Sequence, residues 1–228
     1  RELLINRVRQ GLMYSSASMI ALGSLFIALA TPIVALIYAR GAFENNAVNL
    51  VSGLLIAYGI GMPAYLIRDL LVRVFYALKD GKTPFKLSAI GIFLNIIFDW
   101  ILVGGPTPWG EQMPFNFGAP GLVLATVAIN VFTCLMLLFK LNSRIGNLPL
   151  LDWFKDGLKL LIAGFCSGFS AWIISSVVQW PSGLIGLMIQ LSFSTVISLF
   201  VFCLLGISMQ VKEVEELIMI MRRKIIRF

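Results

Sequence analysis

Six long apolar stretches divide this sequence, and each is long enough to cross a lipid bilayer. A spanning helix needs about 20 mostly apolar residues, and such stretches occur at about 12–39, 49–78, 85–104, 118–140, 157–178 and 184–208. Only 13% of the residues are charged, about half the usual share in a soluble domain. Because backbone polar groups inside a membrane must be paired within the chain, these stretches predict an all-α integral membrane protein.

Lysine and arginine residues gather on one side of the predicted spans. Of the 18 basic residues, Arg40 alone lies on the opposite side, and Arg68 and Arg73 lie within the second span. Cytoplasmic loops are enriched in Lys and Arg, so we expect both ends of the chain in the cytoplasm and no nucleic-acid partner for its net charge of +7. The remaining basic residues are Arg1, Arg7, Arg9, Lys79, Lys82, Lys86, Lys140, Arg144, Lys155, Lys159, Lys212, Arg222, Arg223, Lys224 and Arg227.

The composition gives little support to an enzyme or a resident metal. The chain has no histidine, and Cys134, Cys166 and Cys203 each lie alone in an apolar run, as small buried hydrophobic residues do. No serine or cysteine has a convincing base beside it. The chain begins at Arg1 without a signal-peptide pattern, and we expect it to be a fragment of a longer protein.

The second span carries an unusual set of polar residues. At 100° per residue, Tyr65, Arg68, Asp69, Arg73 and Tyr76 fall on one arc of the helix. Charged residues inside a membrane cost free energy and usually face a cavity or another helix. These residues therefore indicate a substrate pathway, with a structural Asp69–Arg73 pair as the alternative.

Two segments with proline predict irregular helices. Thr31-Pro32 is expected to bend the first span, and the segment 59–63, with Gly59, Gly61 and Pro63, is expected to break the second. A broken helix beside charged residues is typical of transport sites.

The third and fourth spans each carry a polar stripe at helical spacing. Carboxylate, amide and hydroxyl oxygens suit Na⁺ or a proton better than a soft metal. The stripes predict a site for a coupling cation, with a simple hydrogen-bonded seam between helices as the alternative. The stripe residues are Ser88, Asn95 and Asp99 in the third span, and Thr126, Asn130 and Thr133 in the fourth.

The last two spans and the tail have a different character. The fifth and sixth spans are almost free of charge, and Gly164 and Gly168 form a small-xxx-small packing pair. From Val211 to Phe228, apolar residues recur at helical spacing, which predicts an amphipathic helix on the cytoplasmic membrane surface, with a partner-binding helix as the alternative.

Three segments carry a family resemblance, RDLLVRVFYALKDGKTPF at residues 68–85, YARGAF at 38–43 and GAPGLVLAT at 118–126, and the first is the most specific. Together they resemble the MurJ/MviN family, the lipid II flippases of bacterial peptidoglycan synthesis. The resemblance implies the C-terminal portion of a fourteen-helix, two-lobe exporter. By that correspondence, residues 1–141 are the last four spans of the second lobe, 142–210 two extra spans forming a lipid-tail groove, and 211–228 the tail.

The resemblance also implies a function. A monomeric full-length protein would flip an undecaprenyl-linked peptidoglycan precursor across the bacterial inner membrane by alternating access, coupled to Na⁺ or a proton and without another cofactor. Tyr65, Arg68, Asp69 and Arg73 would be cavity candidates. Matched to the family, the cation-site candidates are Asn95, Asp99 and Thr126. The alternatives are another exporter of the same superfamily, a membrane scaffold and a lipid-processing enzyme.

Overall fold

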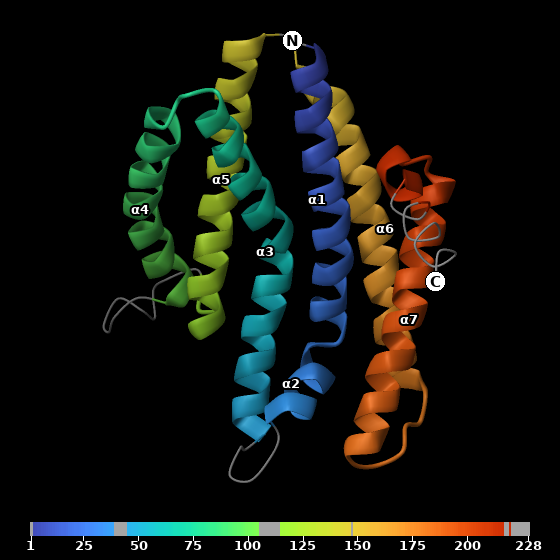
Figure 1. Ribbon diagram of the computed structural model, residues 1–228. Helices are drawn as coiled ribbons and strands as arrows, with labels where there is room; N and C mark the ends of the chain where they lie inside the picture. Colours follow the sequence, from blue (N-terminus) through green and yellow to red (C-terminus); the bar gives the residue numbers. More distant parts are fainter. Residues whose placement is uncertain (1, 39–44, 105–114, 147, 217–218, 220–228) are drawn as a thin grey trace.

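The computed structural model describes residues 2–38, 45–104, 115–146, 148–216 and 219. Across these residues the chain is helical and forms no strand, and every main helix except α2 is long and apolar enough to cross a membrane. The predicted all-α fold with six spans is therefore confirmed. The main helices are α1 (Glu2–Ala28), α2 (Ala30–Tyr38), α3 (Asn45–Ala77), α4 (Lys82–Val103), α5 (Ala119–Ile145), α6 (Leu150–Val177) and α7 (Leu184–Ser208) (Figure 1).

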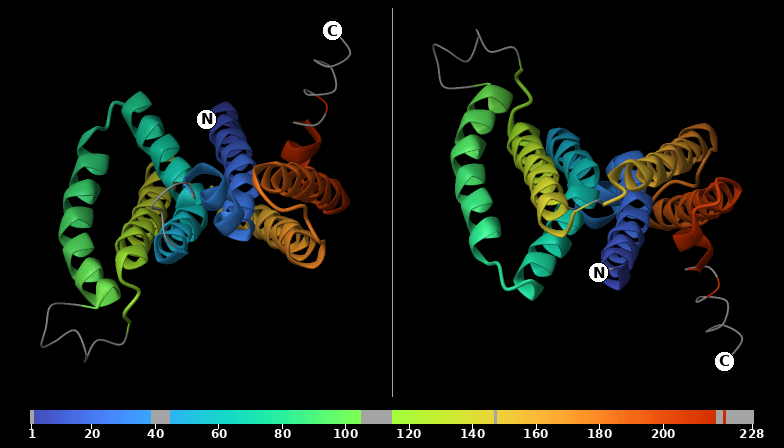
Figure 2. Two further views of the ribbon diagram at one scale, coloured as in Figure 1. Left: turned by 90° about the horizontal axis from the view of Figure 1, so that it is seen from below. Right: turned by 90° about the horizontal axis from the view of Figure 1, so that it is seen from above.

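The six long helices pack in the order α4, α5, α3, α1, α6 and α7 (Figure 2). The consecutive helices α3 and α4 hardly touch, because α5 packs against both of them. The N-terminus and the connections from α3 to α4 and from α5 to α6 lie at one end of the bundle (Figure 1). Most of the described basic residues lie near this end, which we call the basic end. Arg40 and the tail at 217–218 and 220–228 lie outside the described residues.

The first predicted span is divided into two helices. α1 ends at Ala28, and α2 starts at Ala30 and crosses the end of the bundle opposite the basic end (Figure 1). Pro32 has no backbone N–H to donate to the carbonyl of Ala28, so the hydrogen-bond ladder is interrupted there. The predicted bend at Thr31-Pro32 is therefore correct, but the spanning helix is α1 and ends eleven residues earlier than the predicted position 39.

The expected break in the second span is wrong. α3 stays helical from Asn45 to Ala77, with Pro63 inside it. Pro63 leaves the carbonyl of Gly59 without its helical donor, and this same oxygen lies against Gly23 of α1. A methyl group added at Gly23 would stand 2.5 Å from it. The helix thus passes through the proline because the backbone of α1 covers the exposed carbonyl.

Small residues also bring α6 against α1. A Cβ at Gly164 would stand 2.3 Å from a methyl carbon of Ile20, and one at Gly168 would stand 3.1 Å from the carbonyl oxygen of Ser24. The small-xxx-small pair is therefore a packing surface, as predicted from the sequence, and its partner is α1. One helix, α1, thus joins α3 on one side to α6 on the other.

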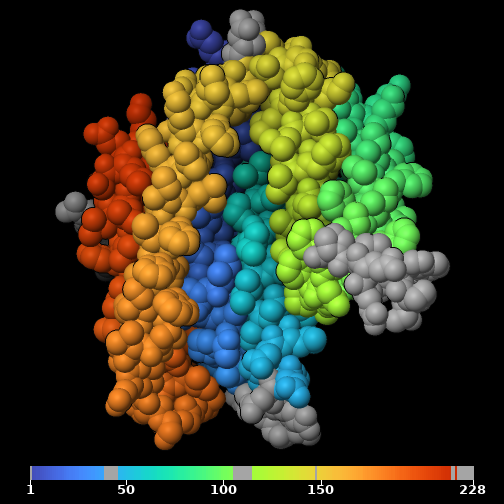
Figure 3. All heavy atoms as spheres, turned by 180° about the vertical axis from the view of Figure 1, so that it is seen from behind, coloured from blue at the N-terminus to red at the C-terminus, as the bar shows by residue number. Residues whose placement is uncertain are grey.

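The main hydrophobic cluster lies toward the basic end. Leu71 and Phe75 of α3, Leu137 and Leu141 of α5, and Leu160 of α6 are buried there with almost no exposed surface. Elsewhere the buried clusters are smaller. Seen from behind, α5 and α6 meet at the basic end and diverge away from it (Figure 3).

An ionic cluster at the basic end joins three distant parts of the chain. The guanidinium group of Arg9 in α1 contacts Asp156 of α6 at 2.7 Å and Glu213, which follows α7, at 2.8 Å. Glu213 is only 3% exposed, and Tyr14 donates a hydrogen bond to Glu216 in the same segment. The first turn of the predicted amphipathic tail therefore packs against the bundle, with Val211 and Val214 buried.

A second polar contact organises the connection from α3 to α4. Asp80 accepts hydrogen bonds from the amide of Thr83 at 3.1 Å and from its hydroxyl at 2.8 Å, and these bonds hold the pKa of the Asp80 carboxyl below its usual range. Arg144, at the end of α5, contacts the same carboxylate at 2.5 Å. The connection is thereby fixed to α5, the helix that separates α3 from α4.

The contact between α1 and α3 predicts a sharp response to one added methyl group. We expect Gly23→Ala to lower the free energy of unfolding by about 1–3 kcal/mol, because the neighbour is a backbone oxygen that cannot rotate away. Gly157→Ala in α6 is the matched control, since its Cβ would meet nothing within 4 Å. Thermal unfolding in detergent compares the two variants; equal stability would refute the proposed close contact.

The ionic cluster predicts a second difference. Arg9→Met leaves the buried carboxylate of Glu213 without its cation, and we expect a loss of about 1–3 kcal/mol in detergent unfolding. Lys155→Met is the control, because its pair with Asp152 is 3.8 Å long and exposed, and such pairs contribute about 0–1 kcal/mol. A loss for Lys155→Met as large as that for Arg9→Met would contradict this account.

Candidate functional site

A polar cavity of about 500 Å³ lies between α3, α4 and α5. It exists because α3 and α4 each pack on α5 and leave space between themselves. The cavity brings together residues from three spans. Its polar lining consists of Tyr65 and Arg68 from α3, Ser88 and Asn95 from α4, and Thr126, Asn130 and Thr133 from α5.

Arg68 supplies the positive charge of this cavity. Its guanidinium group donates a hydrogen bond to the hydroxyl of Ser88 across the gap, at 3.3 Å. Within the described residues, no carboxylate forms an ion pair with Arg68. A guanidinium group presents five N–H donors, so most of its hydrogen-bonding capacity is available to a ligand. This arrangement suits an anionic group that enters between α3 and α4.

Asp99 of α4 does not itself line the cavity but is hydrogen-bonded to the lining residue Asn95. Its Oδ2 accepts a hydrogen bond from the amide nitrogen of Asn95 at 2.6 Å. Its Oδ1 is buried, and none of the described residues donates a hydrogen bond to it. A buried carboxylate oxygen without a donor is costly unless a cation or a proton meets it, so Asn95 and Asp99 together have the character of a cation site.

Thr126 lies at the level of these two residues. α4 and α5 run antiparallel, with Gly91 packed against Ile129 and Gly121 packed against the backbone of Leu102. Asn95 and Asp99 lie between these two contacts on α4, and Thr126 lies between them on α5. The Thr126 hydroxyl donates to the Leu122 carbonyl at 3.1 Å and retains lone pairs that can accept.

Two further residues of the polar stripe predicted for the fourth span line the cavity, although the family resemblance did not place them among the cation-site candidates. The amide of Asn130 donates to the carbonyl of Thr126, and the hydroxyl of Thr133 donates to that of Ile129, both at 2.8 Å. Both side chains are buried. Their spacing with Thr126 was the available signal, and their bonds to their own helix agree with the simpler expectation of a polar seam.

Asp69 and Arg73 do not line this cavity. They form an ion pair of 3.7 Å along the surface of α3, with side chains 58% and 80% exposed. Of the four cavity candidates, Tyr65 and Arg68 line this cavity, and their role there stays a prediction. The helical spacing does not reveal that the described neighbours of α3 leave the side chains of Asp69 and Arg73 exposed.

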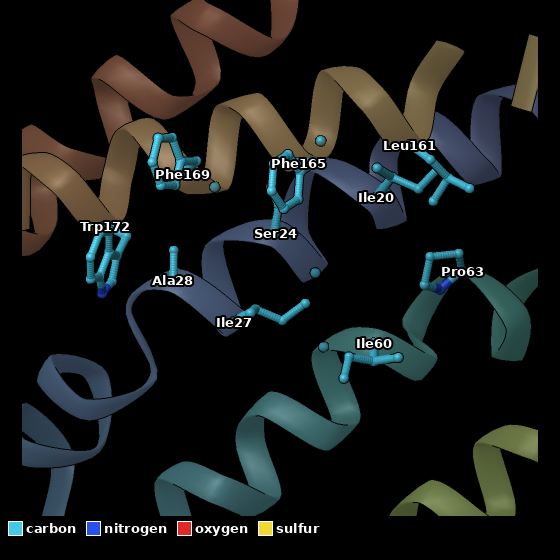
Figure 4. A pocket seen from close by; sticks show the side chains of 14 residues that line it. Ile20, Ser24, Ile27, Ala28, Ile60, Pro63, Leu161, Phe165, Phe169 and Trp172 are labelled. Atoms are coloured by element: carbon cyan, nitrogen blue, oxygen red, sulfur yellow. The ribbon is translucent and has the colours of Figure 1, made fainter. Parts of the chain in front are cut away.

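A second cavity, of about 450 Å³, is an apolar groove between α1, α3 and α6. Figure 3 shows the hollow between α6 and the blue and teal surfaces of α1 and α3. In Figure 4, Phe165 and Trp172 point from α6 toward α1, and Ile27 of α1 lies opposite Ile60 of α3. The lining contains no charged residue.

No group of three or more Cys, Asp or Glu residues that could hold a metal ion occurs among the described residues. The two cavities have different chemistry on different faces of α3. One offers a guanidinium group and hard oxygen atoms, and the other offers hydrocarbon. Such a combination can bind an amphipathic molecule.

The sequence matches a known protein family over most of its length. The family model for the lipid II flippase MurJ matches residues 2–194. The chain is 41% identical over 179 residues to a probable lipid II flippase MurJ of Synechocystis, covering 78% of this chain and 30% of that protein. It is 31% identical over 193 residues to the lipid II flippase MurJ of Thermosipho africanus, covering 85% and 37%.

A solved structure and a more distant relative agree with this. The fold superposes on a lipid II flippase MurJ in an inward closed conformation with a TM-score of 0.62 and 26% identity, covering 90% of this chain and 39% of that one. A probable multidrug resistance protein NorM of Mannheimia succiniciproducens is 29% identical over 202 residues, covering 80% and 40%.

The chain thus spans roughly a third of the length of the flippases that it matches. The family match over residues 2–194 includes α3, α4 and α5, the helices that enclose the polar cavity. The chain is a multi-pass membrane protein, and it belongs to the lipid II flippase MurJ family.

Proposed function

We propose that these helices are the C-terminal part of a transporter that flips lipid II, the lipid-linked precursor of peptidoglycan, across the bacterial inner membrane. Alternating access would expose the polar cavity first to one side of the membrane and then to the other. Both ends of the chain would lie in the cytoplasm, as the placement of the basic residues supports. The single observation that carries the proposal is the membrane-embedded guanidinium group of Arg68, which no described carboxylate neutralises.

In this mechanism Arg68 binds the negatively charged phosphate part of the lipid headgroup. A charged group inside a spanning helix is costly, and an anionic ligand offsets the cost while it is bound. Ser88 holds the guanidinium group across the cavity, and Tyr65 lines the same cavity one turn earlier on α3. The hydrocarbon tail of the precursor would remain in lipid beside the bundle, where the exposed side chains are apolar.

Asp69 and Arg73 are charged residues on the uncovered face of α3. Their exposure suits a face that lines the central space of a two-lobe transporter. Because the pair is weak in water, either side chain can exchange its partner for a substrate group or for another part of the protein at little cost.

A cation would couple the cycle through Asn95, Asp99 and Thr126. The buried Oδ1 of Asp99 and the hydroxyl of Thr126 are hard ligands that suit Na⁺, and protonation of Asp99 would serve the same purpose. Binding would remove the cost of the unpaired oxygen and would draw α4 toward α5. Such a differential interaction is required of any ligand that shifts a conformational equilibrium.

The other functions are less well supported. The relationship to the NorM protein agrees with a shared exporter fold, but the higher identity to the Synechocystis flippase favours a lipid substrate. A non-transporting scaffold would not need a charged group inside the membrane, and the substitution of Arg68 tests this reading directly.

The first functional test replaces the cavity charge. We expect Arg68→Gln to lower flipping about 10-fold or more, because a charge-assisted hydrogen bond is worth about 1.5–3 kcal/mol. The assay uses a chimera in which residues 2–194 replace the matching segment of the Synechocystis protein, in a strain depleted of its own lipid II flippase. Growth and labelled-precursor translocation are measured.

Lys86→Gln is the control, since Lys86 is an exposed cation of α4 that does not line the cavity. If Arg68→Gln supports growth as well as Lys86→Gln does at equal membrane levels, the cavity does not recognise the headgroup. Failure of the unsubstituted chimera would be resolved by the same substitutions at the aligned positions of the Synechocystis protein.

The second functional test removes the negative charge from the proposed cation site. We expect Asp99→Asn to abolish the response of translocation to an imposed Na⁺ or proton gradient while the protein remains in the membrane. Asp152→Asn is the control, because Asp152 is an exposed carboxylate at the start of α6. A variant that still responds to both gradients would exclude Asp99 from coupling.

A further inference from the structure

We propose that α6 and α7 form one rigid pair of helices, which tilts against α1 about the ionic cluster at the basic end. The tilt would change the width of the apolar groove between α1, α3 and α6 at the opposite end of the bundle. This inference concerns motion within the described helices, and it does not depend on which substrate is moved.

Side-chain hydrogen bonds join α6 to α7 at two levels. The hydroxyl groups of Ser167 and Ser198 lie 2.7 Å apart, and the Ser198 hydroxyl also donates to the carbonyl oxygen of Ser167 at 3.1 Å. Eight residues away along each helix, the Gln190 amide donates to the hydroxyl of Ser175 at 2.7 Å and to its carbonyl oxygen at 3.1 Å. Because the two levels are about 12 Å apart, they fix the tilt of α7 on α6 as well as its position.

The two helices also stay in contact between these levels. The two hydrogen-bonded pairs share one antiparallel register, which places Ala171 opposite Ser194, and both of these side chains are fully buried. In the connection to α7, the indole of Trp180 donates to the carbonyl oxygen of Ser175 at 3.3 Å and packs on Phe193, with ring centroids 5.9 Å apart. Two helices joined in this way move as one body.

The contact between α1 and α6 is smooth by comparison. Gly168 packs against the backbone of Ser24, and the Ser24 hydroxyl donates to a carbonyl of its own helix. Between the described residues of α1 and α6, Arg9–Asp156 is the sole side-chain hydrogen bond or ion pair. Helices that meet through small residues, without hydrogen bonds, can slide and tilt without breaking polar contacts.

The basic end is the fixed point of the tilt. Arg9 of α1 binds Asp156 of α6 and Glu213, which follows α7, so one guanidinium group ties both helices to α1. The main hydrophobic cluster lies toward the same end. Farther from the basic end, only a small cluster around Leu25 and Ala171 joins the two parts. Separation there disrupts fewer apolar contacts, so the pair opens at the end opposite the ionic cluster.

A tilt about this point changes the groove unevenly. Trp172 lies sixteen residues beyond Asp156, about 24 Å along α6, so a tilt of about 10° displaces it by about 4 Å. Leu161 lies five residues beyond Asp156 and moves by about a third of that distance; both residues line the groove. The floor stays in place, because Gly23 and Gly59 hold α1 and α3 in backbone contact. The α6–α7 pair is thus a movable wall of the groove.

The experiment measures distances between two spin labels by electron paramagnetic resonance, in lipid nanodiscs. It uses a chimera in which residues 2–216 replace the matching segment of the Synechocystis protein. The labels are attached through introduced ketone side chains, so that cysteines remain available for disulfide bonds. The native cysteines of the chimera are replaced by alanine; in this segment they are Cys134, Cys166 and Cys203.

Two label pairs compare the ends of the bundle. Leu50 of α3 and Val177 of α6 lie at the end opposite the ionic cluster, and Tyr76 of α3 and Leu151 of α6 lie at the basic end. All four side chains are exposed. We expect the distance distribution of Leu50 with Val177 to be wider by about 4 Å, the displacement of a 10° tilt, than that of Tyr76 with Leu151.

Two disulfide locks separate the proposed tilt from general flexibility. Ser24→Cys with Gly168→Cys joins α1 to α6, since a Cβ at Gly168 stands 3.2 Å from that of Ser24, close to the spacing in disulfides. Ser167→Cys with Ser198→Cys joins α6 to α7, where the hydroxyl groups are 2.7 Å apart. We expect the 24–168 lock to narrow the wide distribution, and its reduction to restore the width, whereas the 167–198 lock leaves the distribution unchanged.

Equal widths at the two ends of the unlocked chimera would overturn the proposal. So would a 167–198 lock that narrows the distribution as much as the 24–168 lock does, because α6 and α7 would then move separately. The readout requires no transport, so a failure of the proposed function would not affect it. If the chimera does not accumulate, the same labels and locks at the aligned positions of the intact Synechocystis protein decide between these outcomes.

Discussion

The backbone contact between Gly23 and Gly59 determines how the rest of this protein is arranged. It allows α1 to lie directly against α3, and α1 carries α6 on its other side through Gly164 and Gly168. Since lipid is as apolar as the side chains, close van der Waals packing has to provide much of the attraction between helices. The two halves of the bundle are therefore held together where the side chains are smallest.

The helix α3 separates two environments. One of its faces gives Arg68 and Tyr65 to the polar cavity, and another gives Gly59, Ile60 and Pro63 to the apolar groove. A rotation or tilt of α3 would therefore change both cavities together. Pro63 lies inside the helix at this level, and its missing N–H removes one hydrogen bond that would otherwise resist bending.

Much of this fold could be predicted from the sequence because few backbone structures can cross a membrane with their polar groups paired. Apolar length fixed the number of spans, and helical spacing placed Tyr65 and Arg68 together on one cavity. The interruption at Gly59–Pro63 was predicted wrongly, because composition cannot reveal that the backbone of Gly23 covers the free carbonyl. The exposure of Asp69 and Arg73 depends on which helices become neighbours, and a single sequence does not contain that information.

The cluster around Arg9 has a consequence for biosynthesis. Arg9 leaves the ribosome about 200 residues before its partner Glu213, and Asp156 emerges between them. The guanidinium group of Arg9 therefore stays solvated at the membrane surface, without these carboxylate partners, until the spans that precede each partner have been inserted. Closure of this cluster then marks the moment at which the last span has arrived in the correct direction, because only that topology returns Glu213 to the side of the membrane where Arg9 was left.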